Sequence, residues 1–204
     1  MSKTEDAPYE LFKQALITTT KAMSAERDVE VLFSGDGPRA EPTKITLPPP
    51  PREMSPAIAA RARGEADAQA LRLAPHDAEA HSQARPQGDV GRQVYEAAER
   101  ARIESIGSRA MDGTAANLDA ALSARCEKAG YGRVADRTQA PLAAAIEFLL
   151  RERLTGRALP AEAENFANLW RNEVGADGKR PLDGVIEQLQ DQLVSQLNDQ
   201  AAFA

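Results

Sequence analysis

The chain has 204 residues and a formal net charge of −6, which is enough length for one fair-sized domain or one domain with a small appendage. The acidic balance argues against nucleic-acid binding, which needs a cationic field, and against an anionic membrane surface. The single cysteine, Cys126, excludes an intrachain disulfide and a thiolate zinc cluster. Hydrophobic residues make up 42% of the chain, many of them alanine, and aromatic residues only 4%, which favours closely packed helices over sheets.

The N-terminal sequence MSKTEDAPYELFKQ is charged and lacks the apolar core of a signal peptide. No run of the sequence approaches the roughly 18 apolar residues of a membrane span. We therefore expect a soluble, cytoplasmic protein.

The first predicted element is an amphipathic helix of about four turns after Pro8, because apolar residues recur there at spacings of three and four. In residues 29–33 and in residues 43–47 the side chains alternate between two faces, with a period of two. These two segments lie on either side of the turn-rich sequence SGDGPRAEP. This pattern predicts a β-hairpin. Four consecutive prolines at residues 48–51 predict a stiff, extended spacer.

Beyond the prolines the pattern is helical. Ser55 followed by Pro56 is a strong start signal for a helix that runs to about Ala74. Gly107 and Gly113 predict a loop between two helices. The other helices are expected over residues 90–106, 114–130, 138–156, 160 to a turn at Gly175 and Gly178, and 181–198.

The expected fold class is all-α, with about seven helices and a small β-hairpin inserted near the N-terminus. The expected organisation has three parts. Residues 1–48 form an N-terminal helix and hairpin that pack on the rest, residues 49–54 form a Pro-rich connector, and residues 55–204 form a helical domain.

The two histidines, His76 and His81, are the first candidates for chemistry. Their spacing of five places them about 140° apart on a helix, whereas metal ligands on one helix face are three or four residues apart. Two polar residues on a helix rim is the main interpretation, and a metal site beside Asp77 and Glu79 stays an alternative. The glycines of SGDGP are those of a hairpin turn, because the spacing of a phosphate-binding loop is absent.

The charged residues of the central helix indicate a solvated, ion-paired surface, and no pair is marked as a general acid and base. Its acids and bases alternate along the chain: Glu96, Glu99 and Glu104 with Arg92, Arg100 and Arg102. The basic sequence RERLTGR at residues 151–157 either complements a helix dipole or forms a docking surface for an acidic partner. The residues alone therefore indicate a helical module without a recognisable active site.

Several segments, taken together and in order, resemble a known family. They are VYEAAERARIESIGSRAMDGTAANLDAAL (94–122), ALRLAPHDAEAH (70–81), APLAAAIEFLLRERLTGR (140–157), and the opening LFKQALITTTKAM with the VEVLFSGDGP that follows. This ordered set is similar to the N-terminal part of CobT subunits of the aerobic, ATP-dependent cobaltochelatase of cobalamin biosynthesis. The resemblance covers nearly the whole chain.

The resemblance implies a non-catalytic adapter. The family's complex inserts Co²⁺ into hydrogenobyrinic acid a,c-diamide using ATP and Mg²⁺, a nitrogen–metal ligase reaction. A large subunit holds the tetrapyrrole, an AAA+ ATPase subunit hydrolyses ATP, and the CobT subunit assembles with that ATPase. We therefore expect no catalytic, cofactor-binding or metal-binding residue in this chain. A homo-oligomer formed through the complex is a further expectation, and the oligomeric state of the isolated domain stays open. Basic residues in the family-like segments are the candidate partner contacts: Arg102, Arg151 and Arg153.

The sequence departs from the full family pattern. CobT subunits continue into an acidic linker and a von Willebrand factor A-type domain with a DxSxS metal motif, and neither occurs in these 204 residues. We therefore expect a fragment, and carry over no metal-site residue of the family. Two hypotheses of other classes remain: a generic helical scaffold that dimerises through the Leu182–Leu197 stripe, and an enzyme with a metal site at His76 and His81.

Overall fold

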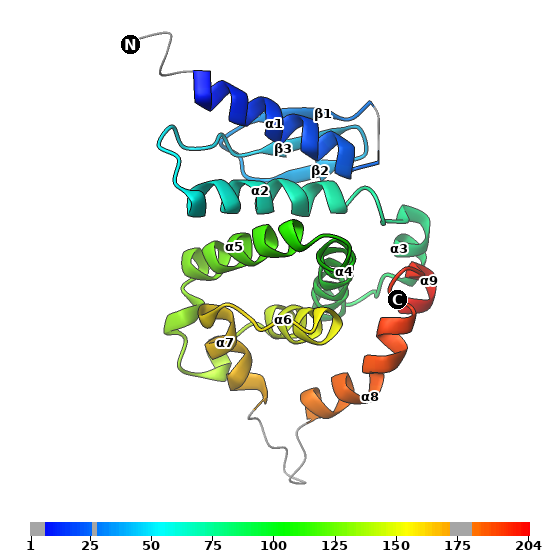
Figure 1. Ribbon diagram of the computed structural model, residues 1–204. Helices are drawn as coiled ribbons and strands as arrows, with labels where there is room; N and C mark the ends of the chain where they lie inside the picture. Colours follow the sequence, from blue (N-terminus) through cyan, green and yellow to red (C-terminus); the bar gives the residue numbers. More distant parts are fainter. Residues whose placement is uncertain (1–6, 26–27, 172–180) are drawn as a thin grey trace. The chain divides into compact units, whose positions relative to one another are not determined.

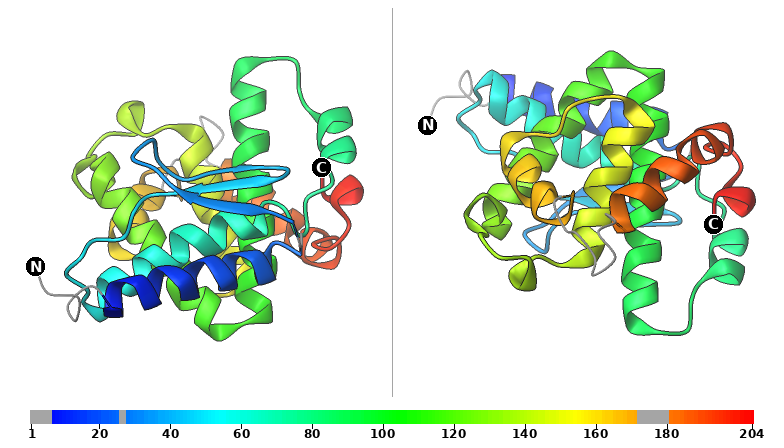
Figure 2. Two further views of the ribbon diagram at one scale, coloured as in Figure 1. Left: turned by 90° about the horizontal axis from the view of Figure 1, so that it is seen from above. Right: turned by 90° about the horizontal axis from the view of Figure 1, so that it is seen from below.

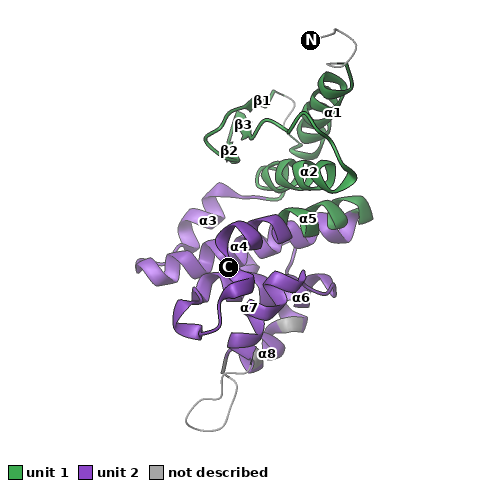
Figure 3. Ribbon diagram, turned by 90° about the vertical axis from the view of Figure 1, so that its left-hand side faces the viewer, with its two compact units in different colours: residues 1–75, 111–121 green, residues 76–110, 122–204 purple. Residues whose placement is uncertain are grey.

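The structure is a computed structural model that describes residues 7–25, 28–171 and 181–204. The chain divides into two compact units, which Figure 3 distinguishes by colour. Unit 1 comprises residues 1–75 and 111–121, and unit 2 comprises residues 76–110 and 122–204. The helix that follows the prolines therefore groups with the N-terminal elements, where the sequence pattern had suggested a boundary at residues 49–54.

Unit 1 contains a three-stranded sheet in the order β1-β3-β2, together with helices α1 and α2 (Figure 1). The two helices pack against each other and both contact the sheet, as the left panel of Figure 2 shows. Its elements are α1 (Ala7–Met23), β1 (Glu30–Phe33), β2 (Arg39–Glu41), β3 (Lys44–Leu47) and α2 (Pro56–Leu71).

The strands do not pair as the predicted hairpin. β1 and β3 are neighbours but run parallel, and the register places Val31 opposite Ile45 and Phe33 opposite Leu47. The sequence expected as a turn contains a third strand, β2, which pairs antiparallel with β3. Parallel pairing aligns the apolar positions of β1 and β3, and Val31, Ile45 and Leu47 are all buried. Burial of these side chains, rather than chain proximity, therefore sets the pairing.

Helix α2 begins as predicted: Ser55 caps it by accepting a hydrogen bond from the backbone N–H of Ile58 at 3.2 Å, with Pro56 in the first turn. Gly64 lies where α2 meets the first half of helix α5 (Asp112–Ala129). A Cβ at this position would lie 1.9 Å from the carbonyl oxygen of Asn117. The two helices therefore approach closely only because residue 64 has no side chain.

Unit 2 is helical, and helix α4 packs against α6 near its centre. The apolar core includes three aromatic rings, with Phe166 4.4 Å from Tyr131 and 5.6 Å from Phe148 between ring centroids. Besides the second half of α5, its elements are α3 (Ala78–Ala84), α4 (Asp89–Ala110), η1 (Tyr131–Arg133), η2 (Arg137–Gln139), α6 (Leu142–Thr155), α7 (Ala161–Arg171), α8 (Pro181–Ser195) and α9 (Gln200–Phe203).

Two predicted helix stops are confirmed, since Gly130 and Gly156 have φ of 72° and 67° at the ends of α5 and α6. The predicted loop between Gly107 and Gly113 is wrong, because only Met111 separates α4 from α5. The last turn of α4 is fixed by Arg109, which donates a hydrogen bond to the carbonyl oxygen of Leu154 at 2.8 Å. Such contacts offset the roughly 1 kcal/mol that a glycine costs inside a helix.

The fold class is confirmed as all-α with a small β element near the N-terminus. The predicted turn at Gly175 and Gly178 lies outside the described residues. Ile186 of α8 and Leu197, two residues beyond the end of this helix, pack into the unit 2 core, while Leu189 stays 41% exposed. In the described part of the chain, no helix combines the length and apolar character that a membrane crossing needs.

Candidate functional site

Arg102 of α4 is the largest fully buried side chain described, at 0% exposure. Its Nε donates to Glu99 Oε2 at 2.7 Å and its Nη2 to Glu99 Oε1 at 2.9 Å. Their spacing of three places both residues on one helix face. A buried guanidinium must be paired, and this two-pronged ion pair satisfies that requirement.

Two more hydrogen bonds of Arg102 reach the C-terminal segment. Its Nη1 donates to the carbonyl oxygen of Leu197 at 2.9 Å, and its Nη2 donates to Gln200 Oε1 at 3.0 Å. The same Gln200 oxygen accepts the backbone N–H of Asp77 at 2.6 Å, just before α3. One buried arginine and one glutamine therefore join α4, α9 and the start of α3 within unit 2.

Both histidines lie beside this network. His76 Nδ1 is 3.0 Å from Glu99 Oε1, and His81 Nε2 is 3.1 Å from Glu96 Oε1. The two rings are 4.9 Å apart between centroids. The separation expected from helical spacing does not apply, because α3 starts after its N-cap Asp77 and His76 lies outside the helix. Glu99, expected on a solvated face, is buried at 7% exposure.

The electrostatics favour an ionised Glu99. Burial alone would raise the pKa of Glu99, but the hydrogen bonds from Arg102 and His76 hold it below its ordinary value. Burial raises the pKa of Tyr95, with Glu99 and Glu96 adding to the shift. In the part of the chain that the structure describes, His76, His81 and Glu99 are the group whose donor atoms suit a metal ion, with one ligand atom from each lying within 4.8 Å of the others.

A second feature of unit 2 is a pocket of about 570 Å³ on the side of α4 that carries Arg92 and Glu96. Glu147, which is buried, accepts from Arg100 Nη1 at 3.0 Å and also pairs with Arg125. Burial would lower the pKa of Arg125, but Glu147 and Glu104 raise it above its ordinary value. The pocket is lined by Arg85, Asp89, Arg92, Gln93, Glu96, Ala97, Arg100, Arg125, Tyr131, Pro141, Ala143, Ala144, Glu147 and Phe148.

The arginines expected to contact partners have different positions. Arg102 is fully buried, and Arg151 is 3% exposed with its Nη1 2.5 Å from Glu104 Oε2. The structure gives both of them an internal role, because their charges are neutralised inside unit 2. Arg153, on α6, is partly exposed.

Sequence reasoning missed the pocket and the role of Gln200. A signal for the pocket was available: Glu147 is the one carboxylate in the apolar run LAAAIEFLL, and a charge in such a position needs a partner. No local signal marks Gln200. Cys126 fits its interpretation as a small buried residue, because it is fully buried and burial raises its pKa to about 11.

Comparison with known proteins identifies a family for this chain. No solved structure matches this chain. A family model described as cobalamin biosynthesis protein CobT matches residues 6–204, which is nearly the whole sequence. The match spans both compact units and includes each segment on which the resemblance was based. The chain therefore belongs to the CobT family of cobalamin biosynthesis proteins.

Proposed function

We propose that this chain is a non-catalytic adapter of the ATP-dependent cobaltochelatase that inserts Co²⁺ into hydrogenobyrinic acid a,c-diamide. The observation that carries the proposal is the family match over residues 6–204. In this role the chain binds the AAA+ ATPase subunit and conveys its nucleotide state to the large tetrapyrrole-binding subunit. In this role ATP, Mg²⁺ and Co²⁺ take part in the reaction of the complex, to which this chain contributes no catalytic residue.

The internal ion pairs support an adapter that keeps its shape. Arg102 with Glu99 and Arg151 with Glu104 are buried on helices that pack together. Removing one partner of such a pair costs about 3–5 kcal/mol, so the arrangement of α4, α6 and α9 resists distortion. An element that relays force between partners needs this resistance.

The pocket of unit 2 supplies the docking chemistry in this proposal. Two guanidiniums, Arg100 and Arg125, share the single carboxylate of Glu147, which leaves a surplus positive charge. Phe148 and Pro141 give the pocket an apolar wall beside that charge. We expect its occupant to be an acidic side chain of the AAA+ subunit, because a carboxylate satisfies an arginine through paired hydrogen bonds.

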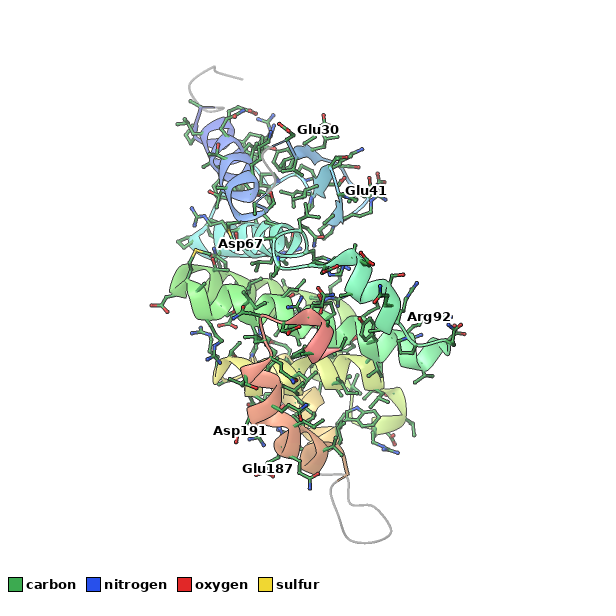
Figure 4. The ribbon with its side chains drawn as sticks, turned by 90° about the vertical axis from the view of Figure 1, so that its right-hand side faces the viewer. Glu30, Glu41, Asp67, Arg92, Glu187 and Asp191 are labelled. Carbon is green, nitrogen blue, oxygen red and sulfur yellow. The ribbon has the colours of Figure 1, made fainter. Side chains whose placement is uncertain are left out.

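Paired charge reversals test this docking surface. Arg92, at the pocket, pairs with Asp89 three residues earlier, and Figure 4 shows it at the outer edge of unit 2. Arg61 on α2 makes a comparable local pair with Glu65 outside the pocket, so it is the matched control. Arg92→Glu is expected to weaken binding to the immobilised ATPase subunit about tenfold, through a slower and less salt-dependent association rate. Arg61→Glu is expected to leave the affinity and the association rate unchanged. Equal effects of Arg92→Glu and Arg61→Glu would contradict the assignment of the pocket as the docking surface.

One observation favours a second candidate function. Val185 and Leu189, four residues apart on α8, are 51% and 41% exposed. Apolar residues at this spacing form a stripe that can pair with a second copy, as in the dimerising scaffold. Sedimentation of wild type and Leu189→Glu distinguishes the two. A dimer that Leu189→Glu converts to monomer supports the scaffold, and a wild-type monomer contradicts it.

A further inference from the structure

We propose that His76, His81 and Glu99 form a binding site for a divalent transition-metal ion of the zinc and cobalt(II) class. The site would lie in unit 2, between the start of α3 and the middle of α4. It is independent of the adapter function, because it concerns this chain's own side chains and needs no partner.

His81 has one ring nitrogen available to a metal ion. Its Nε2 lies 3.1 Å from Glu96 Oε1, and an ionised carboxylate only accepts hydrogen bonds. The proton therefore belongs on Nε2, and Nδ1 carries the lone pair. Among the described residues, Nδ1 of His81 is buried and has no hydrogen-bond partner. A histidine whose Nε2–H donates to a carboxylate, and whose Nδ1 keeps an unshared lone pair, has the arrangement of a metal-binding imidazole.

Leaving Nδ1 of His81 unpaired carries a free-energy cost. A buried acceptor without a partner costs about 1–3 kcal/mol. The neighbouring groups do not relieve this cost, because the Tyr95 hydroxyl donates to the backbone oxygen of His81 at 3.2 Å rather than to the ring. A metal ion at Nδ1 would supply the missing interaction.

The distances between the three ligand atoms are close to those of a tetrahedral site. With bonds of about 2.0–2.1 Å, ligand atoms in such a site are about 3.3 Å apart. His76 Nδ1 and Glu99 Oε1 already meet this condition at 3.0 Å. Because Nδ1 of His76 donates to this carboxylate, the ion would take the place of its proton, which moves to Nε2 or to solvent. One ligand atom from each of the three residues lies within 4.8 Å of the others. His81 must therefore move by roughly 1–1.5 Å to bind the same ion. Its helix α3 has no buried residue, so a shift of this size disturbs no core packing.

The charges around the three residues are balanced and do not oppose a divalent cation. Glu99 Oε1 accepts from Arg102 Nη2 and also lies 3.0 Å from His76 Nδ1, so an ion that replaces the His76 proton would take over the lone pair that faces His76. The guanidinium of Arg102 weakens cation binding, but the carboxylate of Glu96 beside His81 offsets it. With neutral imidazoles the nearby charges sum to zero, because Arg102 pairs with Glu99 and Arg85 pairs with Glu96, so the affinity for a divalent cation comes from the bonds to its ligand atoms.

The donor set selects the class of ion. Two imidazole nitrogens and one carboxylate oxygen suit Zn²⁺ and Co²⁺, whereas Mg²⁺ and Ca²⁺ prefer oxygen ligands alone. Three protein ligands leave a fourth position for water or for a group on a bound partner.

The test uses the whole chain without an affinity tag, stripped with chelator and dialysed. Calorimetric titration with ZnCl₂ is expected to give one equivalent of binding, and titration with CoCl₂ is expected to give the visible absorption bands of four-coordinate Co²⁺. His81→Ala and His76→Ala are each expected to weaken Zn²⁺ binding by about 100-fold or more, and Glu96→Gln by about 10–100-fold. Glu79→Gln removes an exposed carboxylate from the same helix as His81, and is the control expected to leave affinity unchanged.

Circular dichroism of each variant checks that it is folded, and the two histidine variants give two chances of a folded protein without a ligand. Absence of saturable one-to-one binding by folded wild type would overturn the proposal. Equal binding by wild type and a folded histidine variant would also overturn it, since the ion would then sit on surface carboxylates. Because no partner protein is present, failure of this test leaves the adapter proposal untouched.

Discussion

Replacing Gly64 by alanine should separate α2 from α5 in unit 1. The new Cβ would lie 1.9 Å from the Asn117 carbonyl oxygen, 2.6 Å from its carbonyl carbon and 2.8 Å from the Ala121 Cβ. Real Cβ contacts are essentially never under 3.0 Å, so the backbone at Asn117 must move by about 1 Å or more. That movement also strains the hydrogen bond from Asn117 Nδ2 to Asp67 Oδ2, which is 3.0 Å long.

The magnitude follows from three opposing contributions. Overpacking costs about 1–3 kcal/mol, and losing the Asp67–Asn117 hydrogen bond costs about 1 kcal/mol more. The better helix propensity of alanine returns about 1 kcal/mol. We therefore expect Gly64→Ala to lower the free energy of unfolding by about 1–3 kcal/mol, which moves a urea midpoint by about 1 M.

Urea denaturation and amide hydrogen exchange in α2 and α5 measure this effect. Gly113 lies at the start of α5, also in unit 1, and a Cβ added there would have no atom within 4 Å, so Gly113→Ala is the matched control. The control should leave stability unchanged or raise it by up to about 1 kcal/mol. If Gly64→Ala behaves like Gly113→Ala, the close approach of the two helices is refuted.

Three further substitutions test the buried charges. Asp67→Asn should stabilise unit 1 at neutral pH, because burial raises the pKa of Asp67 despite its hydrogen bond from Asn117, and the folded state therefore penalises the charged form. In urea denaturation, the gain in unfolding free energy over wild type should disappear as pH falls through that raised pKa. A gain that grows at low pH would contradict this. Arg102→Leu should destabilise unit 2 by about 3–5 kcal/mol, because it leaves Glu99 buried without its cation and frees residues 197–203. Unchanged hydrogen exchange in residues 197–203 would refute the role of Arg102 in holding this segment to α4. Glu99 has the opposite pH behaviour to Asp67, because its pKa is lowered in the folded state. Its contribution to stability is present above its ordinary pKa and is lost as pH falls through the folded pKa. The difference in unfolding free energy between wild type and Glu99→Gln should therefore shrink in acid.

The helix boundaries that depend on local chemistry could be read from the sequence. Ser55 caps α2 through its own side chain, and Gly130 and Gly156 end helices because each adopts a left-handed conformation. Gly107 misled the prediction, because the same residue type inside a helix is tolerated where packing compensates. Local signals therefore predict where a helix can end, but not where tertiary contacts carry it further.

Features that depend on distant partners could not be read in this way. The parallel pairing of β1 with β3 depends on which apolar faces meet, and a two-residue period is the same for either direction. The burial of Arg102 depends on Leu197 and Gln200, almost a hundred residues later in the chain. His76 and His81 come together because the helix starts between them, and their spacing alone predicted the opposite.

The central claim is that this chain contacts the chelatase ATPase. Analytical gel filtration of the chain with the AAA+ subunit, with and without ATP, tests it most directly. We predict that the two co-elute and that Arg92→Glu shifts the chain back toward its own elution volume while Arg61→Glu does not. Separate elution of the wild-type chain in both nucleotide conditions would contradict the claim.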